Sequence, residues 1–280
     1  MVTYPNVKVN IGLDVLRRRP DGFHDIETLF VPYFGMTDVL EITPSDEFSI
    51  SISSSKPGIP DWNPMSDLCA KAWRLMRERF GIPPVSITLE KRNPVGGGLG
   101  GGSSDAAFTL KMLNELFSLS LSEAELASLA GELGSDCPFF IYNRPMFGAG
   151  RGEILSEFPL YWLDFGGMLN GAEAGSECSS GNNARVRPYV LGVIALDAHL
   201  NISTAQAYRN ITPSVPPVSL REALSRDISQ WRDLIKNDFQ KGVCDAHPVV
   251  ARTIERCYEE GAVYAAMSGS GPSVFYIRKA

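Results

Sequence analysis

Six glycines occupy seven consecutive positions at Gly96–Gly102, and Ser103 and Ser104 follow them. A segment of this kind can bring its backbone N–H groups very close to a ligand, because no side chains intervene. Where it leads into a helix, the N–H groups and the positive end of the helix dipole favour a bound phosphate. A flexible linker has a similar composition. The position of the run between a strand and a helix favours phosphate binding.

The surrounding pattern disfavours the commonest nucleotide-binding loops. Three of the glycines satisfy G-x-G-x-x-G, namely Gly96, Gly98 and Gly101. The preceding segment Val85–Glu90 alternates between apolar and polar residues, whereas a dinucleotide-binding strand is normally buried on both faces. A Walker A loop needs a lysine after its last glycine, and Gly102 is followed by Ser103. The H-R-D signature of protein kinases is absent from the sequence.

The composition of the chain limits which partners it can bind and which cellular compartment suits it. The 280 residues carry 26 Lys and Arg against 32 Asp and Glu, a net charge of −6, which argues against nucleic-acid binding. No apolar run approaches the roughly 20 residues of a membrane span, and the N-terminus shows no secretory signal. The cysteines lie far apart, without metal-site spacing: Cys69, Cys137, Cys178, Cys244 and Cys257. We therefore predict a protein of the reduced cytoplasm with no membrane or nucleic-acid partner.

A strand is predicted at Val7–Val15, because apolar residues fill every odd position. Its odd face is expected in the core and its other face open to solvent. That second face carries four polar residues, Asn6, Lys8, Asn10 and Asp14. Pro20-Asp21-Gly22 predict a tight turn, after which Phe23 and His24 follow.

The other elements alternate between short strands and helices. The predicted strands are Asp38–Ile42, Phe48–Ile52, Val85–Glu90, Val190–Leu196 and Ser273–Ile277. A helix is predicted at about Met65–Phe80, closed by Gly81, and a second one begins with Ser103 or Ser104 as its N-cap. A third runs from Ser122, with Glu125 completing a capping box, to Gly134. Three more are predicted at Leu220–Leu224, Ser229–Phe239 and His247–Glu260.

Three segments, in this order, resemble the GHMP superfamily of small-molecule kinases: Pro5–Asn10, Pro94–Asp105 and Met267–Gly271. Four further stretches are similar to the branch that acts on a cytidine diphosphate ester of methylerythritol in the non-mevalonate isoprenoid route: Arg19–His24, Glu27–Phe30, Gly134–Phe140 and Gly152–Leu155. The similarity covers nearly the whole chain except Asp164–Pro188. It implies that ATP phosphorylates the 2-hydroxyl of the methylerythritol unit.

The resemblance implies an α+β fold of two lobes, with a βαβ nucleotide-binding unit in the first lobe and an α/β second lobe. We expect an N-terminal domain at residues 1–155 and a C-terminal domain at residues 156–280. The segment Asp164–Pro188 is about 20 residues longer than such a fold requires. Because it is rich in Gly, Ser, Asn and Ala, we expect a surface insertion without a catalytic part.

The catalytic pair implied by the resemblance is Lys8 and Asp136. A carboxylate can take the proton of an alcohol, and an ammonium group can keep that carboxylate ionised and orient the alcohol. Each residue also has a plainer interpretation. Asp136 suits a helix N-cap before Pro138, and Lys8 suits a solvated lysine on the open face of a strand.

The resemblance also implies which residues hold the two substrates. The cytosine is expected near Phe23, His24 and Phe30, with Tyr208 on its other side, and Asn10 belongs to the same substrate site. A tyrosine is usual at position 23, so Phe23 keeps the stacking face and lacks the hydroxyl group. Phe23 and Phe30 can equally be core residues, which is the common role of phenylalanine.

ATP is expected on the whole segment from Pro94 to Ser104, which comprises Pro94, Val95, Gly96, Gly97, Gly98, Leu99, Gly100, Gly101, Gly102, Ser103 and Ser104. Mg²⁺ is the expected cofactor, and Ser104 is a candidate ligand. Lys91 is interpreted as a surface lysine, and Asp105 is expected to point outward or towards the metal. The Ser268–Gly271 loop is expected to support the site from the second lobe.

Two alternatives remain open from the sequence. Another GHMP kinase, acting on homoserine, mevalonate or a sugar, would share the glycine loop but would not need the second group of motifs. A catalytically silent nucleotide-binding protein would not need both Lys8 and Asp136. The sequence is compatible with a monomer or a homodimer.

Overall fold

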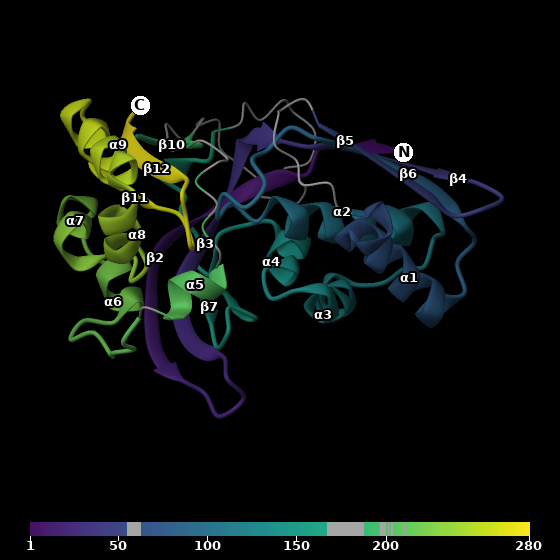
Figure 1. Cartoon of the computed structure of the whole chain (residues 1–280), viewed down its shortest axis with the longest axis horizontal. Helices are drawn as coiled ribbons and strands as arrows, with labels where there is room; N and C mark the ends of the chain where they lie inside the picture. Colours follow the sequence, from purple (N-terminus) through teal and green to yellow (C-terminus); the bar gives the residue numbers. More distant parts are fainter. Residues whose placement is uncertain (55–62, 167–187, 197–199, 201, 203, 210) are drawn as a thin grey trace, which may run out of the picture.

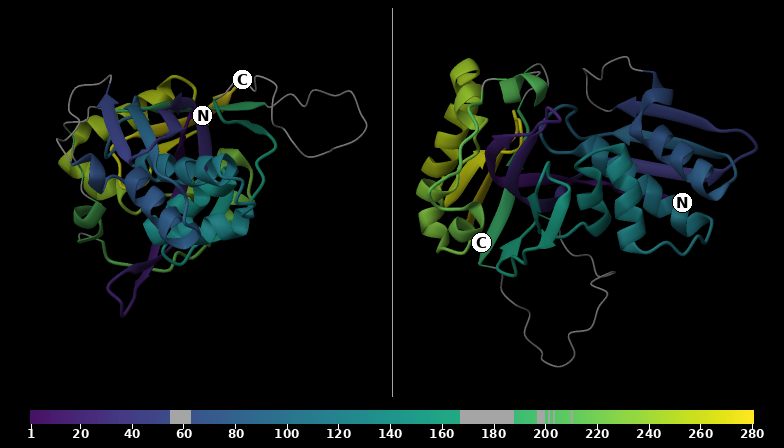
Figure 2. Two further views of the ribbon diagram at one scale, coloured as in Figure 1. Left: turned by 90° about the vertical axis from the view of Figure 1, so that its right-hand side faces the viewer. Right: turned by 90° about the horizontal axis from the view of Figure 1, so that it is seen from below.

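A computed structural model of the chain describes residues 1–54, 63–166, 188–196, 200, 202, 204–209 and 211–280. In this part of the chain, helices surround three four-stranded sheets. Figure 1 shows the long strands β2 and β3 between α1–α4 on one side and α6–α9 on the other. Their hairpin end projects beyond the neighbouring elements, as the left view of Figure 2 also shows. The mixed α+β class is as predicted.

The first sheet has the strand order β1-β4-β6-β5 and contains the predicted βαβ unit. Its strands are β1 (Val2–Thr3), β4 (Val39–Pro44), β5 (Ser49–Ser54) and β6 (Val85–Lys91). β5 pairs in parallel with β6, and the connection between them contains η1 (Pro64–Ser66) and α1 (Leu68–Phe80). Asp67 caps the start of α1, and Gly81 ends it in the left-handed conformation.

Three helices follow β6 in sequence: α2 (Gly101–Leu116), α3 (Glu123–Leu133) and α4 (Cys137–Tyr142). The capping box of Ser122 and Glu125 is present at α3, as predicted. The N-cap predicted for α2 is wrong. Gly100 occupies that position with φ of 72°, and no side chain caps the helix. The first N–H groups of α2 are therefore not taken up by a capping side chain.

The second sheet has the order β2-β3-β7-β8 and is antiparallel throughout. Its strands are β2 (Asn6–Arg18), β3 (His24–Thr37), β7 (Met146–Ala149) and β8 (Ile154–Glu157). The open polar face expected for β2 is wrong, since Lys8, Asn10 and Asp14 are only 4%, 2% and 5% exposed. The odd face packs in the core as expected. The even face is covered as well, because the glycine loop and Asp136 lie against it.

The third sheet has the order β11-β12-β10-β9. Its strands are β9 (Leu163–Asp164), β10 (Tyr189–Ile194), β11 (Tyr264–Met267) and β12 (Val274–Lys279). The helices and short turns of this half are α5 (Thr204–Arg209), α6 (Leu220–Leu224), η2 (Ile228–Gln230), α7 (Trp231–Leu234), α8 (Gln240–Ala246) and α9 (Pro248–Glu259). Of the predicted insertion Asp164–Pro188, residues 167–187 lie outside the described residues.

The helix predicted at Ser229–Phe239 is wrong beyond Leu234. From there the chain turns extended and pairs with β2: Leu13 N–H donates to the Lys236 carbonyl at 2.9 Å, and Asp238 N–H donates to the Leu13 carbonyl at 2.9 Å. Tertiary pairing therefore outweighs the local helical preference of this segment. The pairing also ties the second half of the chain to β2.

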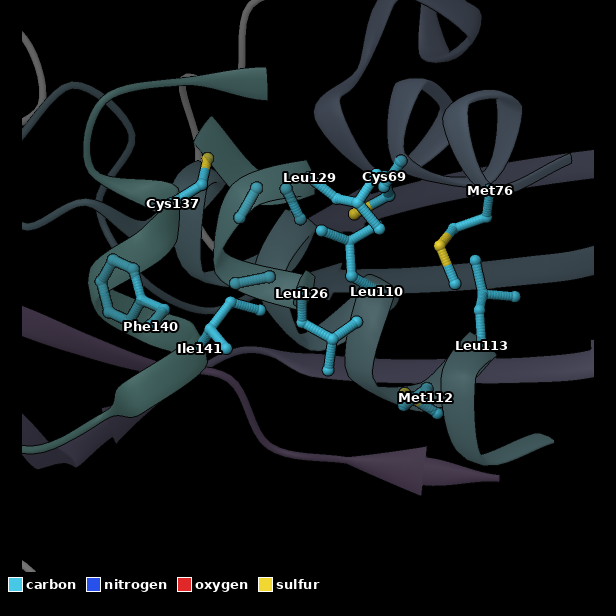
Figure 3. Packing of buried hydrophobic residues seen from close by; sticks show 14 of the residues in the cluster. Cys69, Met76, Leu110, Met112, Leu113, Leu126, Leu129, Cys137, Phe140 and Ile141 are labelled. Atoms are coloured by element: carbon cyan, nitrogen blue, oxygen red, sulfur yellow. The ribbon is translucent and has the colours of Figure 1, made fainter. Parts of the chain in front are cut away.

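The largest apolar cluster lies among α1–α4 and the first sheet. Figure 3 shows Met76, Leu110, Leu113 and Leu126 from three of these helices converging in it. Two further clusters cover the odd face of β2 and join it to the third sheet and its helices. No helix in the described ranges has the length and apolar character of a membrane span.

Asp14 is expected to make stability depend on pH. Burial, followed by the charge of Asp238, raises the pKa of Asp14 from 3.8 to about 6. A carboxyl whose pKa is higher in the fold destabilises the fold increasingly as pH rises from the unfolded pKa to the folded one. Asp14→Asn should therefore add about 1–3 kcal/mol to the free energy of unfolding at pH 7.5 and much less at pH 4.5.

Urea unfolding at the two pH values measures this effect. Asp46→Asn, at an exposed loop position, is the matched control and should change stability little at either pH. If Asp14→Asn raised the free energy of unfolding equally at both pH values, the result would contradict a raised pKa of Asp14.

Candidate active site

A cavity of about 1170 Å³ opens between the glycine loop and the β2–β3 hairpin. Its glycine-loop end is lined by Pro94–Gly98 and Gly100–Ser103, with Lys8 and Asp136 beside them. Its hairpin end is lined by Arg18, Gly22, Phe23 and His24. All the residues predicted for catalysis and acceptor binding line this one cavity: Lys8, Asn10, Phe23, His24, Phe30, Asp136 and Tyr208. Of the predicted ATP segment, Leu99 and Ser104 are not among the lining residues.

Lys8 and Asp136 form an ion pair at the cavity wall. The Lys8 Nζ atom lies 3.3 Å from Asp136 Oδ2, and the two side chains are 4% and 35% exposed. These residues are 128 positions apart in the sequence and come from β2 and from the residue before α4. The carboxylate is open enough to meet a ligand, and the ammonium group beneath it stays fixed.

A polar chain holds the Lys8 ammonium group in place. Lys8 Nζ donates to Asn10 Oδ1 at 2.5 Å and to the Gly98 carbonyl at 3.3 Å. Asn10 Nδ2 donates to Thr28 Oγ1 at 3.0 Å, and Thr28 donates in turn to the Gly12 carbonyl at 2.6 Å. The Asn10 amide is therefore engaged in orienting Lys8. Thr28 belongs to a motif recognised in the sequence, but its tie to Asn10 depends on the β2–β3 pairing.

Asp136 occupies the N-cap position of α4, but its side chain makes no capping hydrogen bond. The interpretation of Asp136 as a side-chain cap is therefore wrong. Pro138 explains how the helix begins without such a cap, because it lacks an N–H group and its φ is already helical. The carboxylate remains available to Lys8 and to the cavity.

The glycine loop is held against the Ser268–Gly271 loop of the second half. A Cβ atom on Gly98 would lie 2.4 Å from the Ser268 carbonyl oxygen, and its φ of +73° is left-handed. Ser273 N–H donates to the Gly97 carbonyl at 3.3 Å, and Ser268 Oγ donates to the Gly98 carbonyl at 3.3 Å. Glycine is required here because two backbone segments touch. The predicted supporting loop is in place.

Lys91 is not a surface lysine, and that prediction is wrong. It is 4% exposed, and its Nζ atom donates to Asp38 Oδ2 and to Asp105 Oδ2. Asp38 Oδ1 accepts the N–H groups of Arg92 and Asn93 at 2.6 and 2.8 Å. The cluster joins the residue before β4, the end of β6 and the first turns of α2, so it fixes both ends of the glycine loop. No sequence signal links Asp38 to Lys91, because 53 residues separate them.

Asp105 does not point outward as expected, because it is 1% exposed and faces Lys91. Burial raises the pKa of Asp105 to about 8. Burial alone would lower the pKa of Lys91, but Asp105 and Asp38 outweigh it and raise the pKa. Lys91 therefore stays charged beside these two carboxyl groups. Ser104 is fully buried in α2, so the structure does not bring its hydroxyl group to the cavity.

The aromatic residues at the hairpin end are arranged differently from the predicted two-sided clamp. The rings of His24 and Tyr208 stack directly on each other, with centroids 4.8 Å apart and planes at 17°. The face of Tyr208 that contacts His24 is therefore covered by the histidine ring. Phe23 is 53% exposed and lines the cavity, with the Arg151 guanidinium group 5.0 Å from its ring centroid.

Phe30 combines both roles that the sequence left open. It is 1% exposed and packs on Phe139 with ring centroids 5.3 Å apart, as a core residue does. It also lines the cavity, where Lys8 Nζ lies 5.4 Å from its ring centroid. Its ring thus forms part of the floor beneath the ammonium group.

Comparison with known proteins agrees with this geometry. Residues 67–144 match the N-terminal domain of GHMP kinases, and residues 219–277 match their C-terminal domain. Among solved structures, a homoserine kinase of Cytophaga hutchinsonii shares the fold with a TM-score of 0.63 at 18% identity, covering 99% of this chain and 86% of the other. The fold and the two domain matches together define the class as GHMP kinases.

Closer relatives narrow this class. The 4-diphosphocytidyl-2-C-methyl-D-erythritol kinase of Bacteroides thetaiotaomicron is 41% identical over 276 residues, which span 98% of this chain and 91% of that protein. A crystal structure of 4-(cytidine 5'-diphospho)-2C-methyl-D-erythritol kinase has a TM-score of 0.71 at 28% identity and covers 99% of this chain and 89% of its own. The chain belongs to the 4-diphosphocytidyl-2-C-methyl-D-erythritol kinase family.

The contact between the glycine loop and the second half predicts different effects for two glycines. Gly98→Ala places a methyl group against the Ser268 carbonyl at a left-handed φ, so it should lower the free energy of unfolding by about 2 kcal/mol or more. Gly102→Ala is the matched control. Gly102 lies in α2, and a Cβ atom there would have Leu68 Cδ1 of α1 as its nearest neighbour, at 4.0 Å. Urea unfolding should show it neutral or stabilised by up to about 1 kcal/mol. Equal effects would contradict this view of the loop.

The buried cluster predicts a large cost for removing its single cation. Lys91→Met leaves the Asp38 and Asp105 carboxyl groups without their partner, so it should destabilise the protein by about 3–5 kcal/mol in urea unfolding. Adding Asp38→Asn and Asp105→Asn to this variant should recover part of the loss. A Lys91→Met protein as stable as the parent would show that the cluster does not hold the loop.

Proposed function

We propose that this protein transfers the γ-phosphoryl group of ATP to the 2-hydroxyl of 4-(cytidine 5'-diphospho)-2-C-methyl-D-erythritol. The step belongs to the non-mevalonate route to isoprenoid precursors, and we place it in the reduced cytoplasm. The observation that carries the proposal is the Lys8–Asp136 pair, 3.3 Å apart at the wall of the cavity that the glycine loop also lines. The names of the similar proteins supply the acceptor.

Asp136 acts as the general base in this proposal. Its partly exposed carboxylate accepts the proton of the acceptor hydroxyl as the oxygen attacks the γ-phosphorus atom. Lys8, held by Asn10 and Gly98, pairs with this carboxylate and orients the alcohol. Phosphoryl transfer depends chiefly on positioning and on charge stabilisation, and both partners are fixed by buried contacts.

The glycine loop and the start of α2 bind the phosphates of ATP through backbone N–H groups. Gly100 caps α2 without a side chain, and Ser103 lines the cavity one turn further along. This design supplies donors without adding a net positive charge. The two described lysines that line the cavity, Lys8 and Lys91, are already paired with carboxylates.

Mg²⁺ is the proposed cofactor, and when bound it neutralises charge on the phosphates of ATP. The Asp136 carboxylate and the Ser103 hydroxyl group are hard oxygen donors on the cavity wall, which suit this cation. No cluster of three or more acidic, His or Cys ligands occurs among the described residues. We therefore expect phosphate oxygens and water to supply most of the coordination.

We further propose that residues 1–155 and 156–280 are the N- and C-terminal domains. The two family matches fall on either side of this boundary. In this division β2 belongs to the first domain, and its odd face packs against the second. The cavity then receives Gly269 and Ser270 from the second domain and the glycine loop from the first.

Asp136→Asn tests the chemistry. It should lower kcat by at least about a hundredfold, because the amide cannot take the hydroxyl proton, while ATP affinity stays the same. Kinetics of ADP release and calorimetric titration with ATP measure the two quantities. Asp245→Asn, an exposed residue paired with Lys241 on α8, is the control and should leave both unchanged. Retained turnover in Asp136→Asn would remove this residue from catalysis.

A panel of acceptors tests the substrate. With ATP and Mg²⁺, ADP release should be fastest with the cytidylylated methylerythritol and at least a hundredfold slower with homoserine, mevalonate or a hexose. Preference for one of those alcohols would redirect the assignment to another GHMP kinase. Absence of turnover with every acceptor, together with normal ATP binding, would favour a silent nucleotide-binding protein.

A further inference from the structure

The three consecutive arginines of the β2–β3 hairpin differ in how their charges are balanced. Arg17 pairs with Asp25, and Arg19 pairs with Asp21 and Asp25 at 3.0 and 2.9 Å. Arg18, between them, is exposed and lines the cavity. Among the residues that the structure describes, it has no carboxylate within ion-pairing distance. Its guanidinium group is therefore available to a ligand.

A second unpaired arginine reaches the same end of the cavity from α5. Arg18 lies directly opposite His24 in the β2–β3 register, and the His24 ring stacks on Tyr208. Arg209 follows Tyr208, is exposed and also lines the cavity. Within the described ranges, Arg209 forms no ion pair either. Two elements that are far apart in the sequence thus each bring a cation to the hairpin end.

Arg151 adds a third guanidinium group there. Its guanidinium carbon lies 5.0 Å from the ring centroid of Phe23, and the residue lines the cavity. Unlike Arg18 and Arg209, it has an ion-pair partner, because its Nε atom lies 3.4 Å from Glu153 Oε1. The carboxylates that line the cavity do not offset this charge, because each has its own partner. Asp136 pairs with Lys8, Asp105 pairs with Lys91, and Asp67 caps α1: these are the acidic residues of the lining.

We propose that Arg18 and Arg209, assisted by Arg151, form a cationic subsite that binds the diphosphate group of the acceptor. The inference rests on the proposed function, since a cytidylylated alcohol carries two phosphates with one negative charge each. Guanidinium groups match such oxygens with paired hydrogen bonds, and they keep their charge at any working pH. An isolated surface arginine would need no ligand, but these cations line one cavity in a chain of net charge −6.

With this subsite, the two phosphate-bearing ligands are bound by different chemical groups. The glycine loop meets the ATP phosphates with backbone N–H groups, while the hairpin end meets the acceptor with arginine side chains. An alcohol without phosphates gains nothing from the hairpin end, so the arginines select for a cytidylylated acceptor over homoserine or a sugar. Because these cations are exposed, salt should weaken acceptor binding more than ATP binding.

The test compares Arg18→Gln, Arg209→Gln and the double variant with the parent enzyme. Arg17→Gln is the matched control, because it lies next to Arg18 but pairs with Asp25 and does not line the cavity. Each single substitution should raise the KM for the cytidylylated methylerythritol about tenfold. Changes in kcat and in the KM for ATP should stay within about threefold. Titration with cytidine 5'-diphosphate and with cytidine reports the diphosphate contribution directly and without turnover.

Each outcome decides the proposal. A higher acceptor KM and weaker cytidine 5'-diphosphate binding, with cytidine binding unchanged, support it. An acceptor KM that is unaffected even in the double variant overturns it and leaves the proposed function intact. A rise in the KM for ATP instead also overturns it, because the arginines would then serve the nucleotide. A parent enzyme that neither binds nor phosphorylates the cytidylylated alcohol removes both the proposed function and the subsite.

Discussion

The buried ammonium group of Lys8 is the constraint on which the site depends. A lysine that is 4% exposed must have its charge and its three donors satisfied, or it would destabilise the fold. Asp136, Asn10 and the Gly98 carbonyl meet that demand, and they come from the residue before α4, from β2 and from the glycine loop. Satisfying one charge therefore brings the proposed base, the glycine loop and the central hairpin to a single point.

The glycine loop is likewise held by tertiary contacts despite its composition. Six glycines in seven positions would leave a free segment highly flexible. The hydrogen bonds of Lys91 to Asp38 and Asp105 join the two ends of the loop, and Gly98 in its middle packs against the Ser268 carbonyl. Glycine serves contact between backbones in this loop, and the tertiary contacts remove its freedom. A loop ordered in advance loses less entropy when it binds a nucleotide.

The charges of the cavity follow a simple division. Beside the glycine loop, the two described lysines that line the cavity, Lys8 and Lys91, are paired with carboxylates, so the proposed ATP site relies on neutral backbone donors. At the hairpin end, Arg18 and Arg209 lack such partners among the described residues, although the chain as a whole is acidic. A net charge counted over the whole sequence cannot reveal this separation, because it depends on which cations are paired in the fold.

The sequence alone determined most element positions, because periodicity and caps are local signals. Its contiguous motifs, through their resemblance to GHMP kinases, supplied the α+β class and the residues that meet in the cavity. It predicted the capping box at Ser122 and the glycine loop between β6 and α2 correctly. It failed where a distant segment decides the outcome. The polar face of β2 is buried by the glycine loop and Asp136, Lys91 is paired with Asp38 across 53 positions, and the chain beyond Leu234 pairs with β2 instead of remaining helical. Only the tertiary structure could settle these points, because burial and charge pairing arise between segments that are brought together by folding.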